Sequence, residues 1–477
     1  MILAFAISMI VVPVLVSINA FAEDASYPEP KLTQDTSSYG KHFQRSMTLM
    51  ELSTPEKRNT VKILYYGQSI VGQRWSDEVD RYLREKYPNT DFVTKNLAIG
   101  GFGSDFLIRT MHYDLLPFYP DLLVFHVYGS HIEYENIIKE VRKRTTAEII
   151  IQTDHANTWP EPEAESLEKQ QDWGGKMNYW FLPSFAEKYD CAIQPQRGEW
   201  VQYMKDNNLE PSDLLTDSVH LNEHGKWLMA ELMKRFMVYL PDESQDEWKD
   251  LVKTYVVGKD IEWKDGKLTL EFDGNRVVAL AGQGEEAAAK VLVDGKKPSE
   301  FPECYTFTRP SGTMNIGWPA IKKISWQNPP ILEEWTVTLS EFNNSHDDFK
   351  FSVAGSATGF DGNGKGSEKF ISNSGRIIIE PQDWVFKFDR KVSEKPTSDG
   401  WTVKWKVVPM FVDEYTPQKV DNPAKEYVTV LIQGLENTPH KLELAANDDK
   451  IPAIKAIRIY TPKLKGNQLF SNFQKSF

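Results

Sequence analysis

Between residues 59 and 240, short apolar runs alternate with segments whose apolar residues recur at helical spacing. The run Asp121-Leu-Leu-Val-Phe-His-Val127 is almost continuously apolar, as a strand must be when a parallel sheet buries it on both faces. Strands that alternate with helices form a sheet covered by helices. The sequence therefore predicts an α/β domain with a parallel sheet over residues 59–240.

The predicted elements of this domain follow one another as strand and helix in turn. Strands are expected at 61–66, 92–99, 121–127, 148–153 and 191–194, and helices at 77–87, 132–144, 175–189 and 222–239. The stretch 23–58 before the first strand is polar and contains several prolines. We expect this stretch to be an N-terminal extension that lies on the surface.

Beyond an acidic boundary at residues 241–249, the apolar pattern changes from helical spacing to alternation. Lys267–Phe272, Trp335–Leu339 and Trp401–Val407 alternate in this way, and turn residues separate them. Such a pattern is typical of antiparallel sheets with one buried face. We expect an antiparallel β-sandwich domain over residues 250–465, followed by a C-terminal tail at 466–477.

The first 22 residues predict a secretory signal peptide. They are almost wholly apolar, and Ala20-Phe21-Ala22 fits the small-x-small rule for cleavage. A secreted or periplasmic protein is expected, and a single N-terminal membrane anchor is the alternative. No other segment is apolar enough to span a bilayer, so no stable membrane insertion is expected after cleavage. The two cysteines, Cys191 and Cys304, are expected to be buried free thiols.

Bulk composition excludes several partners. The net charge is −13 and no long basic run occurs, which argues against nucleic acid and anionic membranes. The glycines around Gly101 lack the spacing of a dinucleotide fingerprint, so no cofactor is expected. His220 and His224 are four residues apart, a spacing that suits zinc on a helix, but no third ligand is evident and no metal is expected.

Three residues supply the groups that a nucleophilic serine needs. A serine requires a base to take its proton, and an imidazole base requires a carboxylate to orient it. Ser69 follows the first predicted strand, and Asp217 and His220 stand just before the last helix. Ligand sites in parallel sheets gather at the carboxyl ends of the strands, where these residues can meet. The sequence predicts Ser69 as nucleophile, His220 as base and Asp217 as its partner.

An acyl-transfer site also needs hydrogen-bond donors for the oxyanion. The backbone N–H groups of Ser69 and Gly101 are expected to supply two, because glycine allows the backbone to come close. His131 follows the third strand, and its side chain is expected to supply a third. Other residues around this edge are expected to bind substrate, namely Gln68, Trp75, His155 and Trp159.

Four segments, taken in order, resemble the sequence blocks of the SGNH (GDSL-type) hydrolase superfamily. Tyr66–Ser69 is similar to the nucleophile block, with Gln where most members have Asp, as in carbohydrate O-acetylesterases. Asn96–Gly101 is similar to the second block and places Gly101 at its oxyanion glycine. Asp217–His220 matches the Asp-x-x-His block. The resemblance covers residues 60–240 and implies a three-layer, flavodoxin-like hydrolase domain.

The third block departs from the family pattern. Gly-x-Asn-Asp is replaced by Gly129-Ser130-His131-Ile132, so histidine stands where the family has an oxyanion asparagine. An imidazole N–H can donate as an amide does, whereas a lost donor typically costs ~100- to 1,000-fold in rate. The change is also consistent with a different substrate, or with other chemistry in which Glu133 and Glu135 take part.

Strands at 428–435, 439–444 and 456–460 resemble the last strands of jelly-roll domains attached to carbohydrate-active esterases. Together with the fourteen tryptophans, whose faces suit sugar rings, this favours a glycan substrate. We expect an exported serine esterase that removes acetyl groups from a polysaccharide or oligosaccharide through an acyl-enzyme. The alternatives are a lipase-like or thioester-cleaving enzyme, a glycosidase on the same scaffold, and a disabled hydrolase that only binds glycan.

Overall fold

The computed structural model describes residues 27–31, 35–243, 249–284, 286–310, 318–345, 347–393, 397–447 and 450–464. The expected signal peptide at 1–22 and the expected tail at 466–477 lie outside these ranges and stay predictions. Within the described ranges, no helix combines the length and the apolar character that crossing a bilayer requires.

Five parallel strands form the sheet of the N-terminal half, in the order β2-β1-β3-β4-β5. They are β1 (Thr60–Gly67), β2 (Asp91–Asn96), β3 (Leu122–His126), β4 (Glu148–Gln152) and β5 (Ala192–Gln194). Every residue of β3 and β4 is buried. The predicted parallel α/β sheet is confirmed, and its order changes direction between β1 and β3, where doubly wound sheets bind ligands.

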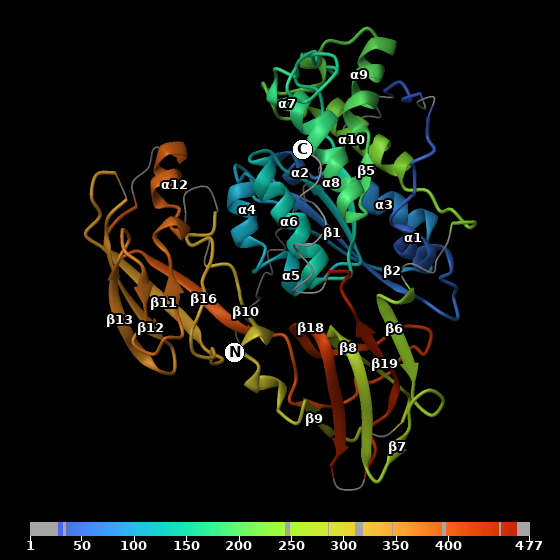
Figure 1. Ribbon diagram of the computed structural model, residues 1–477, viewed down its shortest axis with the longest axis vertical. Helices are drawn as coiled ribbons and strands as arrows, with labels where there is room; N and C mark the ends of the chain where they lie inside the picture. The colour runs from blue at the N-terminus through green and yellow to red at the C-terminus, as the bar shows by residue number, and fades with distance from the viewer. Residues whose placement is uncertain are drawn as a thin grey trace, which may run out of the picture.

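Helices cover both faces of this sheet and give a three-layer arrangement (Figure 1). One face packs on α4 (Ser104–Thr110), α5 (Leu115–Phe118), α6 (His131–Arg144) and α8 (Leu182–Tyr189). The other packs on α1 (Gln44–Glu51), α2 (Ser69–Gly72), α3 (Ser76–Lys86), α9 (Gln196–Asp206) and α10 (Glu223–Phe236). Side chains alternate between the two layers: Leu64 and Tyr66 face the first, and Ile63 and Tyr65 the second.

The expectation that residues 23–58 lie on the surface is wrong for their second half. Phe43 and Met47 are completely buried, and Phe43 stacks on Phe236 of α10 with ring centroids 5.6 Å apart. The backbone between them has buried partners. The backbone N–H groups of Arg45 and Ser46 donate to the buried Glu148 carboxylate at 2.8 and 2.7 Å.

The same segment creates a pH-sensitive contact. Tyr39 donates a hydrogen bond to Glu199 of α9, and burial raises the pKa of Glu199 to about 7. The folded protein therefore keeps a proton that the unfolded chain releases near pH 4.3, so stability falls as the pH rises from about 4.3 to 7. Glu199→Gln carries no charge and is expected to unfold with a free energy up to ~3 kcal/mol larger than wild type at pH 8.

Urea unfolding at pH 4.5 and pH 8 measures this difference. The gain of Glu199→Gln over wild type should nearly disappear at pH 4.5, where Glu199 is still protonated in the folded protein and half protonated in the unfolded chain. Glu187→Gln is the matched control, because Glu187 is exposed on α8. A gain for Glu199→Gln that is the same at both pH values would show that the carboxyl does not titrate in the folded state.

The C-terminal half is built of antiparallel sheets, as predicted. A seven-stranded sheet has the order β17-β9-β18-β8-β19-β6, with β7 beside β8, and a five-stranded sheet has the order β10-β16-β11-β12-β13. The first comprises β6 (Val252–Val256), β7 (Trp263–Lys264), β8 (Lys267–Ala281), β9 (Ala289–Val293), β17 (Glu414–Tyr415), β18 (Val428–Ala446) and β19 (Ile454–Tyr460). The second comprises β10 (Tyr305–Phe307), β11 (Glu334–Ser340), β12 (Lys350–Gly355), β13 (Gly359–Lys365) and β16 (Thr402–Pro409).

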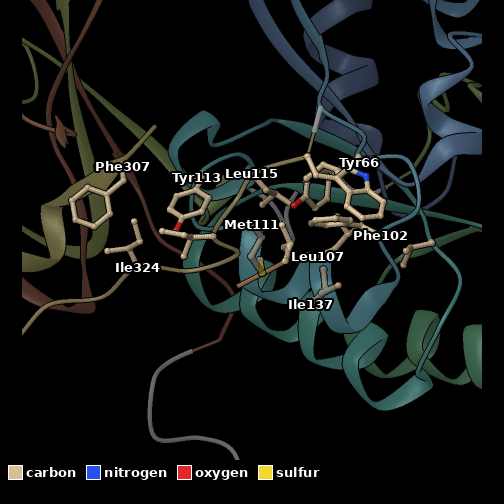
Figure 2. Packing of buried hydrophobic residues seen from close by; sticks show 14 of the residues in the cluster. Tyr66, Phe102, Leu107, Met111, Tyr113, Leu115, Ile137, Phe307 and Ile324 are labelled. Carbon is tan, nitrogen blue, oxygen red and sulfur yellow. The ribbon is translucent and has the colours of Figure 1, made fainter. Parts of the chain in front are cut away.

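The two antiparallel sheets contact the α/β half in different ways. Figure 1 shows the seven-stranded sheet below the α/β layers and the five-stranded sheet beside α4, with α12 (Phe386–Ser393) above it. The seven-stranded sheet has a hydrophobic cluster of its own, whereas the five-stranded sheet shares one with α4, α5 and α6. In Figure 2, Phe307 and Ile324 belong to the same cluster as Tyr113 and Met111.

Ion pairs accompany this shared core. Arg309 contacts Asp114 at 2.7 Å, and Arg109 of α4 pairs with the buried Asp383. Cys191 and Cys304 are both buried and free, as predicted. The C-terminal half is therefore packed directly against the helices that follow β2 and β3.

Candidate active site

Ser69 lies directly after β1, beside the point where the strand order changes direction. It is the first residue of α2, and Gln68 caps this helix by accepting the Ile70 N–H at 2.8 Å. The Ser69 Oγ also lies 3.1 Å from the Gln68 Oε1. Ser69 is half-buried, so its hydroxyl is held by the turn and still accessible.

Asp217 and His220 are held in a tight loop before α10. One carboxylate oxygen of Asp217 accepts the N–H groups of Val219 and His220, each at 2.7 Å. The other lies 2.8 Å from the His220 Nδ1. Hydrogen bonds from the His220 backbone and ring and from the Val219 N–H lower the pKa of Asp217 to about 2. The carboxylate is therefore ionised near neutral pH, which fixes the proton of the imidazole on Nδ1.

The loop brings His220 to Ser69. The His220 Nε2 lies 2.9 Å from the Ser69 Oγ, across 151 positions of sequence. The structure thus brings the three residues into one hydrogen-bonded chain with contacts of 2.9 and 2.8 Å. In this chain Nε2 is free to take the serine proton while Nδ1 donates to Asp217, which is the arrangement that activates a serine.

Three side chains that hold the loop in place were not recognised as such in the sequence. Gln73, four residues after Ser69, pairs with both backbone groups of Leu221 at 2.8 and 2.9 Å. Asn157 donates to the Ser218 carbonyl at 3.0 Å. The His155 Nε2 lies 2.9 Å from the Val219 carbonyl oxygen. The position of Gln73 one helical turn after the serine is the only local signal for this role.

His155 was expected to bind substrate, and the structure corrects this. It is 1% exposed, and burial lowers its pKa to about 4, so the ring is neutral and donates from Nε2 to Val219. Gln68 and Trp75 are likewise buried, at 4% and 1% exposure. Trp75 donates to the Ile70 carbonyl at 3.1 Å and packs on Tyr65. Because their side chains face inward, all three support the site and present no surface to a ligand.

Gly101 lies in the turn after β2 with a φ of +80°, a conformation that favours glycine. Within the described residues its N–H makes no hydrogen bond. Trp318 comes from the C-terminal half and donates its indole N–H to the Gly100 carbonyl at 2.6 Å. Its ring packs so closely that a Cβ on Gly101 would lie 2.8 Å from it. The C-terminal half therefore braces this turn, a contact that no sequence pattern indicated.

The structure does not bring His131 into the hydrogen-bonded chain. Its ring stacks on Phe181, with centroids 4.2 Å apart and planes 16° apart, and lies 5.5 Å from Trp173. Trp173 is 48% exposed. The oxyanion role of His131 stays a prediction, and the observed feature is an aromatic cluster of these three residues.

Trp159 is 43% exposed, and its indole N–H donates to Glu210 at 2.7 Å. The side chains of Asp217 and His220 are also open to solvent, at 56% and 40%. His224 contacts Tyr203 and Tyr27 rather than His220, and no three metal-binding side chains converge in the part of the chain that the structure describes. The Asp217 and His220 side chains are therefore accessible to solvent among the residues that the structure describes.

No protein-family model matches this sequence, and no curated protein matches it. Among solved structures, the chain is similar to a two-domain esterase active on acetylated mannans, with 12% identity, 90% of this chain and 97% of that chain covered, and a TM-score of 0.34. It is also similar to an acetylxylan esterase from Geobacillus stearothermophilus, with 16% identity, 38% and 97% covered, and a TM-score of 0.32.

Proposed function

We propose that this protein is a serine esterase that removes acyl groups, acetyl above all, from a polysaccharide or oligosaccharide. The observation that supports it is the hydrogen-bonded chain of Ser69, His220 and Asp217, with the Gly100–Gly101 turn packed beside Ser69. Each of the three has the partner that its chemical role requires. The ionised Asp217 already faces the imidazole before any substrate arrives.

The reaction has two steps. The Ser69 Oγ attacks the acyl carbon while the His220 Nε2 takes its proton, and the same proton then passes to the departing sugar hydroxyl. This leaves an acyl group on Ser69. Water, deprotonated by His220, attacks the acyl carbon, and Ser69 recovers its proton as acetate leaves.

Backbone donors stabilise the negative oxygen of each tetrahedral intermediate. Ser69 is the first residue of a helix, where an N–H has no acceptor within the helix. The Gly101 N–H is the second donor, and the side chain of His131 remains the proposed third. Fixed donors of this kind typically contribute ~100- to 1,000-fold in rate each.

The exposure of the site residues favours a large substrate such as a sugar polymer. A chain of sugars can reach Asp217 and His220, whose side chains are 56% and 40% exposed. Trp173 is 48% exposed and offers an aromatic face on which a sugar ring can stack. Trp159 is a second exposed indole that can stack on a sugar ring. The apolar segment at residues 1–22 supports export to where such polymers occur.

The glycosidase alternative finds little support in Glu135. A glycosidase acid needs a raised pKa. Burial acts to raise the pKa of Glu135, but hydrogen bonds from Lys188 and Tyr189, at 2.6 and 2.8 Å, outweigh burial and lower this pKa. A carboxyl that is held ionised in this way suits an ion pair between α6 and α8.

Acetate release tests the proposal. Purified protein should liberate acetate from acetylated plant polysaccharides and 4-nitrophenol from its acetate ester, and leave chemically deacetylated polymer unchanged. Mass spectrometry after a rapid acid quench should find one acetyl group on the peptide that contains Ser69. Absence of acetate release from every ester, together with no labelling of Ser69 by a fluorophosphonate, would refute the esterase proposal.

A further inference from the structure

A second polar chain runs into the protein behind Ser69. Gln68, whose Oε1 lies 3.1 Å from the Ser69 Oγ, directs its Nε2 towards the His126 Nδ1 at 3.4 Å. The His126 Nε2 lies 2.9 Å from a carboxylate oxygen of Asp154. Gln68 and His126 are 4% and 2% exposed. This chain joins the ends of β1, β3 and β4 under the nucleophile.

The far end of this chain is fixed by Asn178 of the π-helix Lys176–Phe181. The Asn178 amide donates to Asp154 at 2.8 Å, and its oxygen accepts the Asp154 N–H at 2.8 Å. Burial acts to raise the pKa of Asp154, but hydrogen bonds from His126 and Asn178 outweigh it and lower the pKa. An ionised carboxylate only accepts hydrogen bonds, so the His126 Nε2 must carry a proton.

The orientation of Gln68 follows from this tautomer. A neutral imidazole protonated on Nε2 presents Nδ1 as an acceptor, and only the NH₂ end of Gln68 can face it. The amide oxygen is then directed to the Ser69 hydroxyl and the Ile70 N–H. The opposite orientation would place NH₂ against the Ile70 N–H, and an unpaired buried donor is unfavourable.

Ser69 therefore has one hydroxyl proton and two acceptors, the Gln68 Oε1 and the His220 Nε2. Rotation of the hydroxyl between them leaves the Oγ within reach of both. The Gln68 amide is neutral, so it holds the serine without adding a charge. A carboxylate in its place would put a negative charge beside the developing oxyanion.

We propose that Asp154 and His126 form a buried acid–imidazole pair that fixes the Gln68 amide and thereby positions the Ser69 Oγ for attack. The inference rests on the proposed function. Asp154 and His126 are positioning residues, because neither can touch a substrate at the Ser69 hydroxyl. Their loss acts on the geometry of the nucleophile and not on sugar binding.

Asp154→Asn tests this pair. An asparagine at this position can donate to the His126 Nε2, which moves the ring proton to Nδ1 and removes the acceptor that fixes Gln68. We expect kcat for 4-nitrophenyl acetate and for acetylated polysaccharide to fall by about 10- to 100-fold, with KM unchanged, since small misplacements of a reacting group have effects of this size. The rate at which a fluorophosphonate labels Ser69 should fall in parallel.

Asp121→Asn is the matched control. Its carboxylate is covered to the same degree, with 13% of the side chain exposed against 14% for Asp154, and it pairs with Arg45 at the opposite end of the strands. Both variants should lose stability, and only Asp154→Asn should lose kcat per folded molecule. Equal kcat values, or a change confined to KM, would overturn the inference.

A measurement on the wild-type protein covers the case in which Asp154→Asn does not fold. Nitrogen–proton NMR correlation of the His126 ring should find the neutral form protonated on Nε2, and a proton on Nδ1 would overturn the inference. If wild type releases no acetate, the proposed function fails first. If wild type is active and Asp154→Asn equals it, only the positioning pair fails.

Discussion

Replacement of Ser69 by alanine is expected to lower kcat/KM by at least ~1,000-fold, for 4-nitrophenyl acetate and for acetylated polysaccharide alike. Alanine lacks the Oγ, which is the atom that the His220 Nε2 contacts in the hydrogen-bonded chain. Initial rates of 4-nitrophenol and acetate release measure the loss. Unfolding temperatures should stay close to wild type, because the hydroxyl is half-buried and already partly solvated.

Ser218→Ala is the matched control for this substitution. Ser218 is exposed in the same loop as His220, and its carbonyl, which Asn157 holds, is unchanged by the substitution. It should keep wild-type activity. His220→Ala should match Ser69→Ala, and the double variant should be no worse than either, because residues that act as a unit are not additive. A Ser69→Ala protein with half the wild-type rate would rule out Ser69 as nucleophile.

Gly101→Ala is expected to lower kcat/KM by about 100-fold or more, through the loss of one oxyanion donor. A left-handed φ of +80° costs a non-glycine residue roughly 1–2 kcal/mol, and the new Cβ would lie 2.8 Å from the Trp318 ring. We expect the strain and the collision to shift the turn and so to displace the Gly101 N–H. Steady-state rates on 4-nitrophenyl acetate measure the effect.

Gly258→Ala is the control for the same backbone strain at a glycine outside the candidate site. Gly258 has a φ of +83°, yet a Cβ there would meet no atom within 4 Å. It carries the same backbone strain without the collision, in the seven-stranded-sheet half, and should keep full activity. If Gly101→Ala remains as active as Gly258→Ala, the strain and the collision do not displace the proposed oxyanion donor, and the expected dependence of the rate on this turn is wrong.

The sequence predicted the elements whose signals are local. The continuous apolar run at 121–127 indicated a strand buried on both faces, and β3 is one. Asp217 and His220 are three residues apart, so their contact needs only a tight loop. The segment 175–189 was expected to be one helix, whereas the structure has a π-helix at Lys176–Phe181 before α8. A π-helix has more residues per turn than an α-helix, but a segment of six residues is too short for apolar periodicity to reveal the difference.

Contacts between distant segments were not predictable in this way. The indole of Trp318 and the Gly100 carbonyl are 218 positions apart, and no sequence pattern around either residue indicates that the two are in contact. The polar side chain of His155 suggested a position near the substrate. His155 is instead buried, because its Nε2 donates a hydrogen bond to the Val219 carbonyl. In residues 39–50 polar side chains outnumber apolar ones, so the sequence predicted a surface segment. Its buried hydrogen-bond partners, Glu148 of β4 and Glu199 of α9, are far away in the sequence.

The brace of the Gly100–Gly101 turn has a consequence for biosynthesis. During translation, Ser69, Asp217 and His220 leave the ribosome well before Trp318, whose indole packs on that turn. A nascent chain, or one interrupted before residue 318, carries the whole hydrogen-bonded chain of the site but lacks the ring that steadies its oxyanion turn. On the proposed function, full hydrolytic competence is therefore expected late in synthesis, when the C-terminal half has folded against the first.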